Sequence, residues 1–221
     1  MTEFDLDQVD RLLTTTRAVR KRLDLARPVP RELILDCIRI ATQAPAGGNY
    51  QKWRWLIVDA ADKRQAIADA YLRAYQPYID AQKQAVAERT PGDSVVERIM
   101  SSSDYLAHNL GEVPVHVIPC ALGGPYDDEG GATGAGWWGS VLPAVWSFIL
   151  AARARGLGTT WTTLHLRYER EVGDLLGIPD MVTQLALLPT AYYTGDTFKP
   201  GTRRPAEEVT YWNSWKQREA Q

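Results

Sequence analysis

ATQAPAGGNYQKWRWLIV, residues 41–58, places a glycine-rich turn between a helix and a strand. A helical pattern stops at Pro45, two glycines follow, and the run from Trp53 to Val58 is aromatic and β-branched, as strands are. A dinucleotide-binding GxGxxG turn has the reverse order, because it follows a strand and opens a helix. The stretch therefore disfavours a doubly wound nucleotide-binding fold.

The remaining chain alternates helical and strand patterns without a regular βαβ rhythm. We expect helices over residues 5–13, 30–45, 61–89 (one or two, interrupted at Pro77), 94–109, 140–158 and 167–179. We expect strands over residues 53–60, 113–122, 159–166 and 181–193, with a glycine-rich loop at 123–138. This pattern predicts a single α+β domain in which helices cover a mixed central sheet. Residues from about 194 to 221 have little apolar periodicity, so we expect an extension that lies across another surface, such as a partner subunit.

Composition excludes several classes of protein. The 221 residues carry 25 basic and 27 acidic side chains, which argues against a nucleic-acid-binding protein. Cys37 and Cys120 supply neither a disulfide framework nor a metal site, and they suit a reducing compartment. The sequence predicts neither a signal peptide nor a membrane span, so we expect a cytoplasmic protein without membrane or nucleic-acid partners.

Two basic segments could bind an anion. RAVRKR, residues 17–22, has four cations in six residues, and the planar guanidinium of Arg17 suits a phosphate. FKPGTRRP, residues 198–205, adds Lys199, Arg203 and Arg204. Read alone, RAVRKR is more often a solvated basic turn before a helix, and FKPGTRRP is equally well a solvated loop.

Polar groups that could recognise a flat ring lie in two further places. In the turn, Asn49 and Gln51 each offer an amide that could bond the edge of a heterocycle, although a helix stop alone would explain the same residues. LGTTWTTLHL, residues 157–166, offers hydroxyls and backbone amides, although threonine is also an ordinary strand former. The three histidines are scattered, and His116 alternates within an apolar strand as a core residue would. A bound cofactor would therefore have to supply any chemistry.

Taken in order, these stretches resemble the FMN-dependent nitroreductase family. The matching stretches are RAVRK (17–21), PAGGNYQKW (45–53), AARARGLGTTWTT (151–163), LALLPTAYY (185–193) and RRP (203–205). The resemblance implies a three-layer α-β-α sandwich, an intertwined homodimer and interfacial FMN sites. Two family serines are replaced here, by Val19 and Ala46.

The resemblance also implies roles for individual residues. Arg17 and Arg203 would hold the FMN phosphate, and Lys21 would face N1 and O2 of the flavin. The turn would lie along the ring, often from the other subunit, and the threonine segment would bring a backbone amide to N5. The implied cofactor-binding residues are Arg17, Ala18, Val19, Lys21, Pro45, Ala46, Asn49, Thr162, Thr163 and Arg203.

The resulting hypothesis is an oxidoreductase that takes a hydride from NADH or NADPH onto flavin N5 and then reduces a nitroaromatic, quinone or similar aromatic acceptor, by a ping-pong mechanism. Trp137, Trp138 and Tyr126 could form aromatic walls for the acceptor, although a core or interface role is as good an interpretation. The alternatives are a reductive dehalogenase, a flavin-transforming relative of the same fold, or a flavin-binding sensor without turnover.

Overall fold

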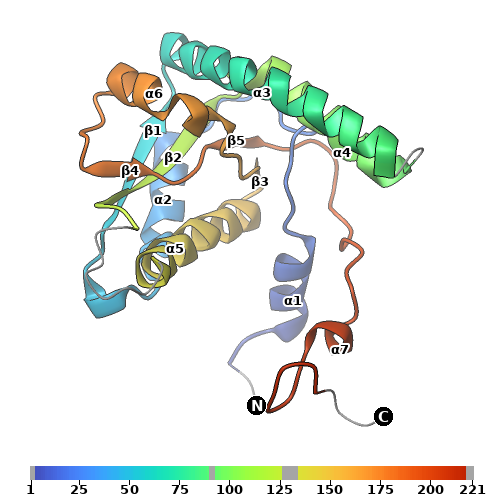
Figure 1. The fold of residues 1–221 in the computed structure, drawn as a ribbon. Coiled ribbons are helices and arrows are strands. Elements are labelled where there is room, and N and C mark those ends of the chain that lie inside the picture. The colour runs from blue at the N-terminus through green and yellow to red at the C-terminus, as the bar shows by residue number, and fades with distance from the viewer. Residues whose placement is uncertain (1–2, 90–92, 126–133, 218–221) are drawn as a thin grey trace. The chain divides into compact units, whose positions relative to one another are not determined.

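The computed structural model describes residues 3–89, 93–125 and 134–217 (Figure 1). The chain forms two compact units: a core unit of Arg17–Asp196, and a terminal unit made of Met1–Thr16 and Thr197–Gln221. The core unit holds the sheet and the helices that cover it. The prediction that the C-terminal residues from about 194 cross a partner subunit stays a prediction.

The elements follow one another closely along the core unit. Its helices are α2 (Arg31–Ala41), α3 (Ala61–Arg89), α4 (Ser94–Asn109), α5 (Ala135–Ala154) and α6 (Glu169–Leu176), with the short 3-10 helices η1 (Gly47–Asn49), η2 (Leu110–Glu112) and η3 (Leu164–Tyr168). Its strands are β1 (Trp53–Val58), β2 (Val115–Leu122), β3 (Leu157–Thr159), β4 (Val182–Gln184) and β5 (Leu188–Tyr192). The terminal unit contains α1 (Leu6–Thr15) and α7 (Ala206–Val209).

The central sheet has the strand order β1-β2-β5-β3, and β4 also pairs with β2. Each ladder is antiparallel, while an isolated parallel bridge joins Ala18 to Thr159 beyond the last strand. Figure 1 shows α2 and α5 on one face of the sheet and α3 and α6 on the other. The predicted α+β sandwich with helices on both faces is confirmed.

Strand β2 shows how the sheet divides the core. Val115, Val117 and Ala121 pack in one apolar cluster with α2 and α5, which includes Phe148 of α5. The side chain of His116 points to the opposite face, because successive residues of a strand alternate between faces. Its Nε2 lies 2.8 Å from the carbonyl oxygen of Leu110 in η2. The alternation buries both faces of one strand.

Helix α3 corrects the predicted interruption at Pro77. The helix runs without a break through this proline, which lies on the exposed side. On the other side, Tyr71, Ala74, Tyr75 and Ile79 are buried. Burial along this face outweighs the one backbone hydrogen bond that a proline removes.

Three further predictions of element boundaries were wrong. The helix predicted at 140–158 begins already at Ala135, after a left-handed Gly134 (φ 68°), so that Trp137 and Trp138 lie in a helix and not in a loop. The strand predicted at 159–166 ends at Thr159, and the strand predicted at 181–193 is two strands. Tertiary pairing explains both changes, because Thr162 and Leu187 leave their strands to exchange backbone hydrogen bonds with each other.

Helix α5 also bears on the prediction that no segment spans a membrane. Among the described helices it is the one whose length and apolar composition would allow a crossing. That evidence is weak, because the central helix of a sandwich has the same composition. The buried residues of α5, such as Val141, Phe148 and Ala152, pack in the apolar cluster with α2 and the sheet.

Two histidines lie in the core, as expected for His116. His116 and His165 are both fully buried, and neither ring nitrogen of His165 bonds to a described residue. Burial lowers the pKa of His116 to about 4. Burial, and then the neighbouring His116, lowers the pKa of His165 to about 3. Both rings are therefore neutral in the folded protein near neutral pH.

These shifts predict a loss of stability in mild acid. Unfolded histidine titrates near pH 6.5, so below that pH the unfolded state binds protons that the native state does not. The free energy of unfolding should be constant above about pH 7 and should fall by about 1–2 kcal/mol per histidine between about pH 7.5 and about pH 5. Urea unfolding at these two values measures the loss.

Two variants separate the core histidines from other acid-labile groups. His165→Leu should remove the share of the loss that belongs to His165. His108→Gln changes a histidine whose side chain is 53% exposed, and it should leave the whole loss in place. Equal stability of the unchanged protein at both pH values would contradict the assignment.

Candidate functional site

The basic segment Arg17–Lys21 is tied to the edge of the sheet. The Val19 amide donates to the carbonyl oxygen of Thr159 at 2.8 Å, and Ala18 pairs with Thr159 in the parallel bridge. The Val19 side chain is 2% exposed, so it faces the core, whereas Arg17 and Lys21 are exposed. Val19 thus anchors the segment by packing.

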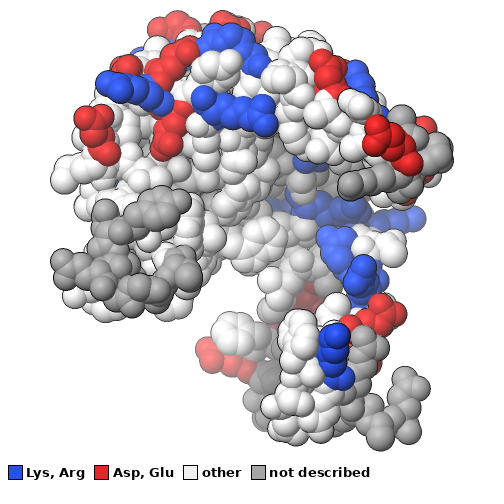
Figure 2. All heavy atoms as spheres, in the orientation of Figure 1, with Lys and Arg blue, Asp and Glu red and all other residues white. Residues whose placement is uncertain are grey.

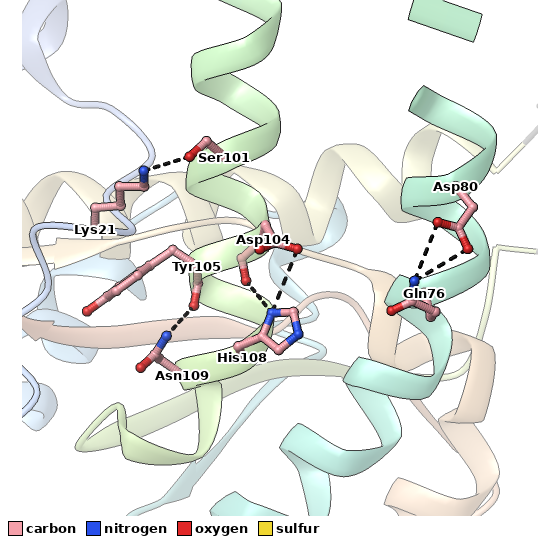
Figure 3. Close-up of polar contacts among 8 residues, drawn as sticks. All are labelled: Lys21, Gln76, Asp80, Ser101, Asp104, Tyr105, His108 and Asn109. Atoms are coloured by element: carbon pink, nitrogen blue, oxygen red, sulfur yellow. Dashed lines mark hydrogen bonds and ion pairs between the residues drawn. The ribbon is translucent and has the colours of Figure 1, made fainter. Parts of the chain in front are cut away.

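Helix α4 offers hydroxyl groups to this segment. Lys21 Nζ donates to Ser101 Oγ at 2.7 Å (Figure 3). Arg20 Nη1 donates to Ser102 Oγ at 3.4 Å. In Figure 2 a group of basic side chains lies beneath α4. Because both contacts are with neutral hydroxyls, the positive charges of Arg20 and Lys21 keep their full attraction for an anion.

The threonine segment meets the basic segment across a cavity of about 230 Å³. Its lining includes Arg20, Tyr71, Ser103, Trp161, Thr162 and Thr163. The Thr162 amide donates to the Leu187 carbonyl oxygen at 3.1 Å, and the Leu187 amide donates back at 2.8 Å. The Thr162 amide is therefore already used, and what Thr162 can offer a ligand is its hydroxyl. We call the segment Arg17–Lys21 with Thr162, Thr163 and this cavity the basic half-site.

The glycine-rich turn forms a second group, at the start of α5. The Gly47 amide donates to Ser140 Oγ at 2.9 Å, and the Asn49 amide donates to the Ala46 carbonyl oxygen at 2.9 Å. Gln51 Nε2 donates to Asn49 Oδ1 at 3.1 Å, so Gln51 holds the turn. Pro45 is exposed.

A second cavity of about 230 Å³ opens at this turn, and its lining includes Ala46, Gly47, Tyr50, Lys52, Trp137 and Ser140. We call the turn Pro45–Gln51 with this cavity the turn half-site.

The predicted aromatic walls have mixed outcomes. Trp137 lines the turn half-site but is only 6% exposed. Its Nε1 donates to the Leu122 carbonyl oxygen at 3.3 Å, and its ring meets Trp138 edge-on at 4.7 Å. Much of the surface of both tryptophans is thus in contact with other side chains. Tyr126 lies outside the described residues.

Helix α5 separates the two half-sites. Ser140 contacts the turn near one end of the helix, whereas β3 and the basic half-site follow its other end (Figure 1). About 20 Å of helix lies between Ser140 and Ala154, at a rise of 1.5 Å per residue. The two cavities share no lining residue. One chain therefore does not bring both predicted groups around one ligand.

Arg203 belongs to the terminal unit. Its Nη1 donates to the carbonyl oxygen of the adjacent Thr202 at 2.8 Å, and its side chain is exposed. The predicted pairing of Arg203 with Arg17 around one phosphate stays a prediction.

Sequence reasoning missed several lining residues of the basic half-site. Tyr71 comes from α3, where its spacing indicates only an amphipathic helix, and Ser103 comes from α4. No local sequence pattern predicts that either helix lies against the threonine segment. Trp161 was visible inside that segment, where its large apolar surface between polar threonines was the available signal.

Thiol and metal chemistry do not fit the described residues. Both cysteines are free and buried. Burial raises the pKa of the Cys37 thiol to about 11 and that of Cys120 to about 12, so neither is a thiolate at neutral pH. No cluster of potential metal ligands occurs among residues 3–89, 93–125 and 134–217.

The chain is thus an α+β protein whose candidate ligand site is lined by hydroxyls beside a basic segment. The model of the "Nitroreductase family" matches residues 13–192. The chain belongs to the nitroreductase family, and the predicted resemblance is confirmed.

Individual relatives are distant. A putative NAD(P)H nitroreductase of Bacillus subtilis, YfhC, is 20% identical over 181 residues, which cover 82% of each chain. The 5,6-dimethylbenzimidazole synthase of Rhodospirillum rubrum is 28% identical over 168 residues, which cover 72% of this chain and 70% of the relative. A crystal structure of oxidised iodotyrosine deiodinase bound to FMN and 3-iodo-L-tyrosine matches with a TM-score of 0.67 at 22% identity, over 90% of this chain and 96% of that one. At such identities the structural likeness shows the fold alone.

Gly158 provides a test of how the basic half-site is positioned. A Cβ atom at Gly158 would lie 2.9 Å from Val19 Cβ and Cγ1, so the basic segment would have to move away from β3. Gly158→Ala should lower the free energy of unfolding by about 1–3 kcal/mol. Gly139→Ala is the matched control, because its Cβ meets nothing within 4 Å and it lies inside α5. It should stabilise the protein by about 0.5–1 kcal/mol in the same urea titration. Equal stability of Gly158→Ala and the unchanged protein would refute the tight approach.

Proposed function

We propose that the protein is an FMN-dependent oxidoreductase that uses NADH or NADPH to reduce small aromatic acceptors, such as nitroaromatics or quinones. The observation that carries the proposal is the basic half-site, where Arg20 and several hydroxyls line one cavity beside the segment that carries Arg17 and Lys21, in a chain of the nitroreductase family. The names of the distant relatives, a nitroreductase and a structure bound to FMN among them, agree with it.

The residues of both half-sites fit FMN. Its phosphate is a dianion that suits the exposed Arg17 beside Arg20 and Lys21. Its ring is flat and has an edge of alternating donors and acceptors, which suits the hydroxyls of Thr162 and Thr163. In the turn half-site, Gly47 and Gly48 have no side chain and allow close approach of a ring. Asn49 adds an amide nitrogen to which no described residue supplies an acceptor.

The separation of the half-sites supports a cofactor site built by two copies of the chain. With about 20 Å of helix between them, the basic half-site of one copy and the turn half-site of another can face one ring, as the two within one chain cannot. We therefore propose a homodimer with composite sites. Two exposed tryptophans of the terminal unit, Trp212 and Trp215, would contact the second copy.

Each group of the chain would have a limited task. When bound, FMN would supply the redox chemistry by accepting a hydride from the nicotinamide and passing two electrons to the acceptor. Lys21, which Ser101 holds at 2.7 Å, would place a positive charge where negative charge builds up on reduction. Val19 and Thr159 would fix the segment that carries Arg17 and Lys21.

The cavity of the basic half-site should bind anionic or neutral electron acceptors better than cationic ones. The lining of the cavity in the basic half-site contains Arg20 and no carboxylate, together with the rings of Tyr71, Tyr78 and Trp161. Reductive dehalogenation and flavin transformation stay as alternatives, and distant relatives bear the names iodotyrosine deiodinase and 5,6-dimethylbenzimidazole synthase. A flavin-binding sensor without turnover is the alternative outside catalysis. The free cysteines agree with the reducing cytoplasm as the proposed location.

Purified protein tests the proposed function directly. We expect a yellow protein that bleaches under anaerobic conditions with NADH or NADPH and regains its colour with nitrofurazone or menadione. Colour without bleaching would indicate a flavin-binding sensor. A colourless protein that does not take up added FMN would exclude the proposed function.

Arg17 provides a test of phosphate recognition. Arg17→Ala should weaken FMN binding by about 10- to 100-fold, which is the effect expected for a lost charge-assisted contact. Riboflavin, which lacks the phosphate, should bind the variant and the unchanged protein equally. Fluorescence titration measures both affinities, and Arg98→Ala in α4 is a control for loss of an exposed arginine. An equal loss for FMN and riboflavin would argue against a phosphate contact.

The same variant tests whether the site is composite. Gly47→Val would disturb the turn, because a Cβ at Gly47 lies 2.9 Å from Ser140 Oγ. When the two variants are unfolded and refolded together, mixed dimers carry one site with both half-sites intact. FMN binding should then reappear in the mixture, and its absence would favour a site within one chain.

A further inference from the structure

The hydroxyl of Thr162 is the part of this residue that stays available in the basic half-site. Its amide and carbonyl groups are both bonded to Leu187, at 3.1 and 2.8 Å. These backbone contacts therefore fix the position of the Thr162 Cα atom, and the hydroxyl keeps only its rotations about the side-chain bonds. Something else has to determine in which direction the hydroxyl donates.

Tyr71 is the residue that meets this hydroxyl. The phenol oxygen of Tyr71, in α3, lies 3.1 Å from Thr162 Oγ1, and either oxygen can be the donor. Tyr71 is 2% exposed, and its ring stacks on that of Tyr75 at a centroid distance of 6.4 Å. Packing thus holds the phenol in place, while its hydrogen bond crosses from a helix to the threonine segment.

Tyr71 and Thr162 both line the cavity of the basic half-site. A pair of hydroxyls has a property that a backbone amide lacks, because each oxygen both donates and accepts. If Tyr71 donates to Thr162, the hydrogen of Thr162 is left to donate to a ligand. If Thr162 donates to Tyr71, a lone pair of Thr162 is left to accept from a ligand.

We propose that Tyr71 is a positioning residue that sets the direction of the Thr162 hydroxyl toward the flavin, so that Thr162 donates to the oxidised ring and accepts from the reduced ring. The proposal rests on the function proposed above. Its chemical basis is that the N5 nitrogen of an oxidised flavin has a lone pair and no hydrogen, whereas the reduced ring carries an N–H there. The pair can serve both states by reversing one hydrogen bond, without movement of the backbone.

Loss of the Tyr71 hydroxyl should affect the binding of oxidised and reduced flavin to different extents. With oxidised flavin, the Thr162 hydroxyl would still donate to the ring. It would lose only the hydrogen bond that its oxygen accepts from Tyr71. With reduced flavin, the hydrogen of Thr162 would lose its acceptor, and a buried donor without an acceptor is unfavourable. Tyr71→Phe should therefore weaken the binding of reduced FMN more than that of oxidised FMN, and the reduction potential of the bound flavin should fall.

The experiment compares reduction potentials of variants that bind FMN. For Tyr71→Phe, we expect the ratio of reduced to oxidised FMN affinity to fall by about three- to tenfold, the effect of one lost hydrogen bond. This corresponds to a potential lower by about 15 to 30 mV for a two-electron couple. The affinity for oxidised FMN and the melting temperature of the apoprotein should change little.

Tyr78→Phe is the matched control. Tyr78 lies on the same helix and lines the same cavity, but its hydroxyl bonds to no described residue. This variant should leave the potential unchanged. Thr162→Val should also lower the potential, because the N–H of the reduced ring then lacks an acceptor, and a buried N–H without a partner is less tolerated than a buried acceptor without one. Adding Tyr71→Phe to it should have no further effect, because the two residues act through one hydroxyl. Thr162→Ser keeps the hydroxyl and should keep the potential.

Two results would overturn the proposal: a potential in Tyr71→Phe equal to that of the unchanged protein, or an equal shift in Tyr78→Phe. If Tyr71→Phe does not fold, Thr162→Val and Thr162→Ser decide, and equal potentials in these two variants would overturn it. Failure of the unchanged protein to bind FMN would defeat the proposed function as well. FMN binding and turnover with an unchanged potential in Tyr71→Phe would defeat this inference alone.

Discussion

The hydrogen bond from the Val19 amide to the Thr159 carbonyl oxygen is the contact on which the basic half-site depends. A segment with four cations in six residues repels itself and, free in solution, would have no fixed direction. Here it is held as an additional partner of β3, and the absence of a side chain at Gly158 lets Val19 approach closely. The buried valine and the glycine thus stabilise a cluster of charges that would otherwise lie apart. Within this segment, residues that pack in the core and residues that could bind an anion lie next to one another in the sequence.

Helix α5 has a comparable role for the molecule as a whole. It is the central apolar helix, and it is also the spacer that keeps the turn at one end and the threonine segment at the other. A shorter helix would have let one chain surround a ligand. With this length, the composite site proposed above would need a second copy of the chain, so that folding and assembly would both be required to form it.

How far the sequence predicted the structure depended on whether the deciding contact was local. The prediction gave the bounds of α4, and it placed β1 and β2 to within two residues at each end, because burial leaves a pattern in the local sequence. Pro77 misled the prediction, since the buried face of α3 outweighs one lost hydrogen bond. The end of β3 and the division between β4 and β5 could not be predicted, because both depend on the pairing of Thr162 with Leu187 across the sequence. The contact of the Tyr71 hydroxyl with Thr162 could not be predicted for the same reason. The basic segment and the glycine turn could be predicted, because their composition is unusual within a short stretch of sequence.

The backbone of the glycine turn limits what evolution or an engineer can change there. Gly48, Asn49 and Gln51 all have positive φ angles, of 57°, 54° and 48°. Glycine adopts this conformation freely and asparagine tolerates it, but a β-branched residue is strongly disfavoured. A mutant library that randomised these three positions to widen the range of substrates would consist largely of misfolded turns. Tyr50 has an ordinary backbone conformation and is 77% exposed, so diversity is best introduced at this one position of the turn.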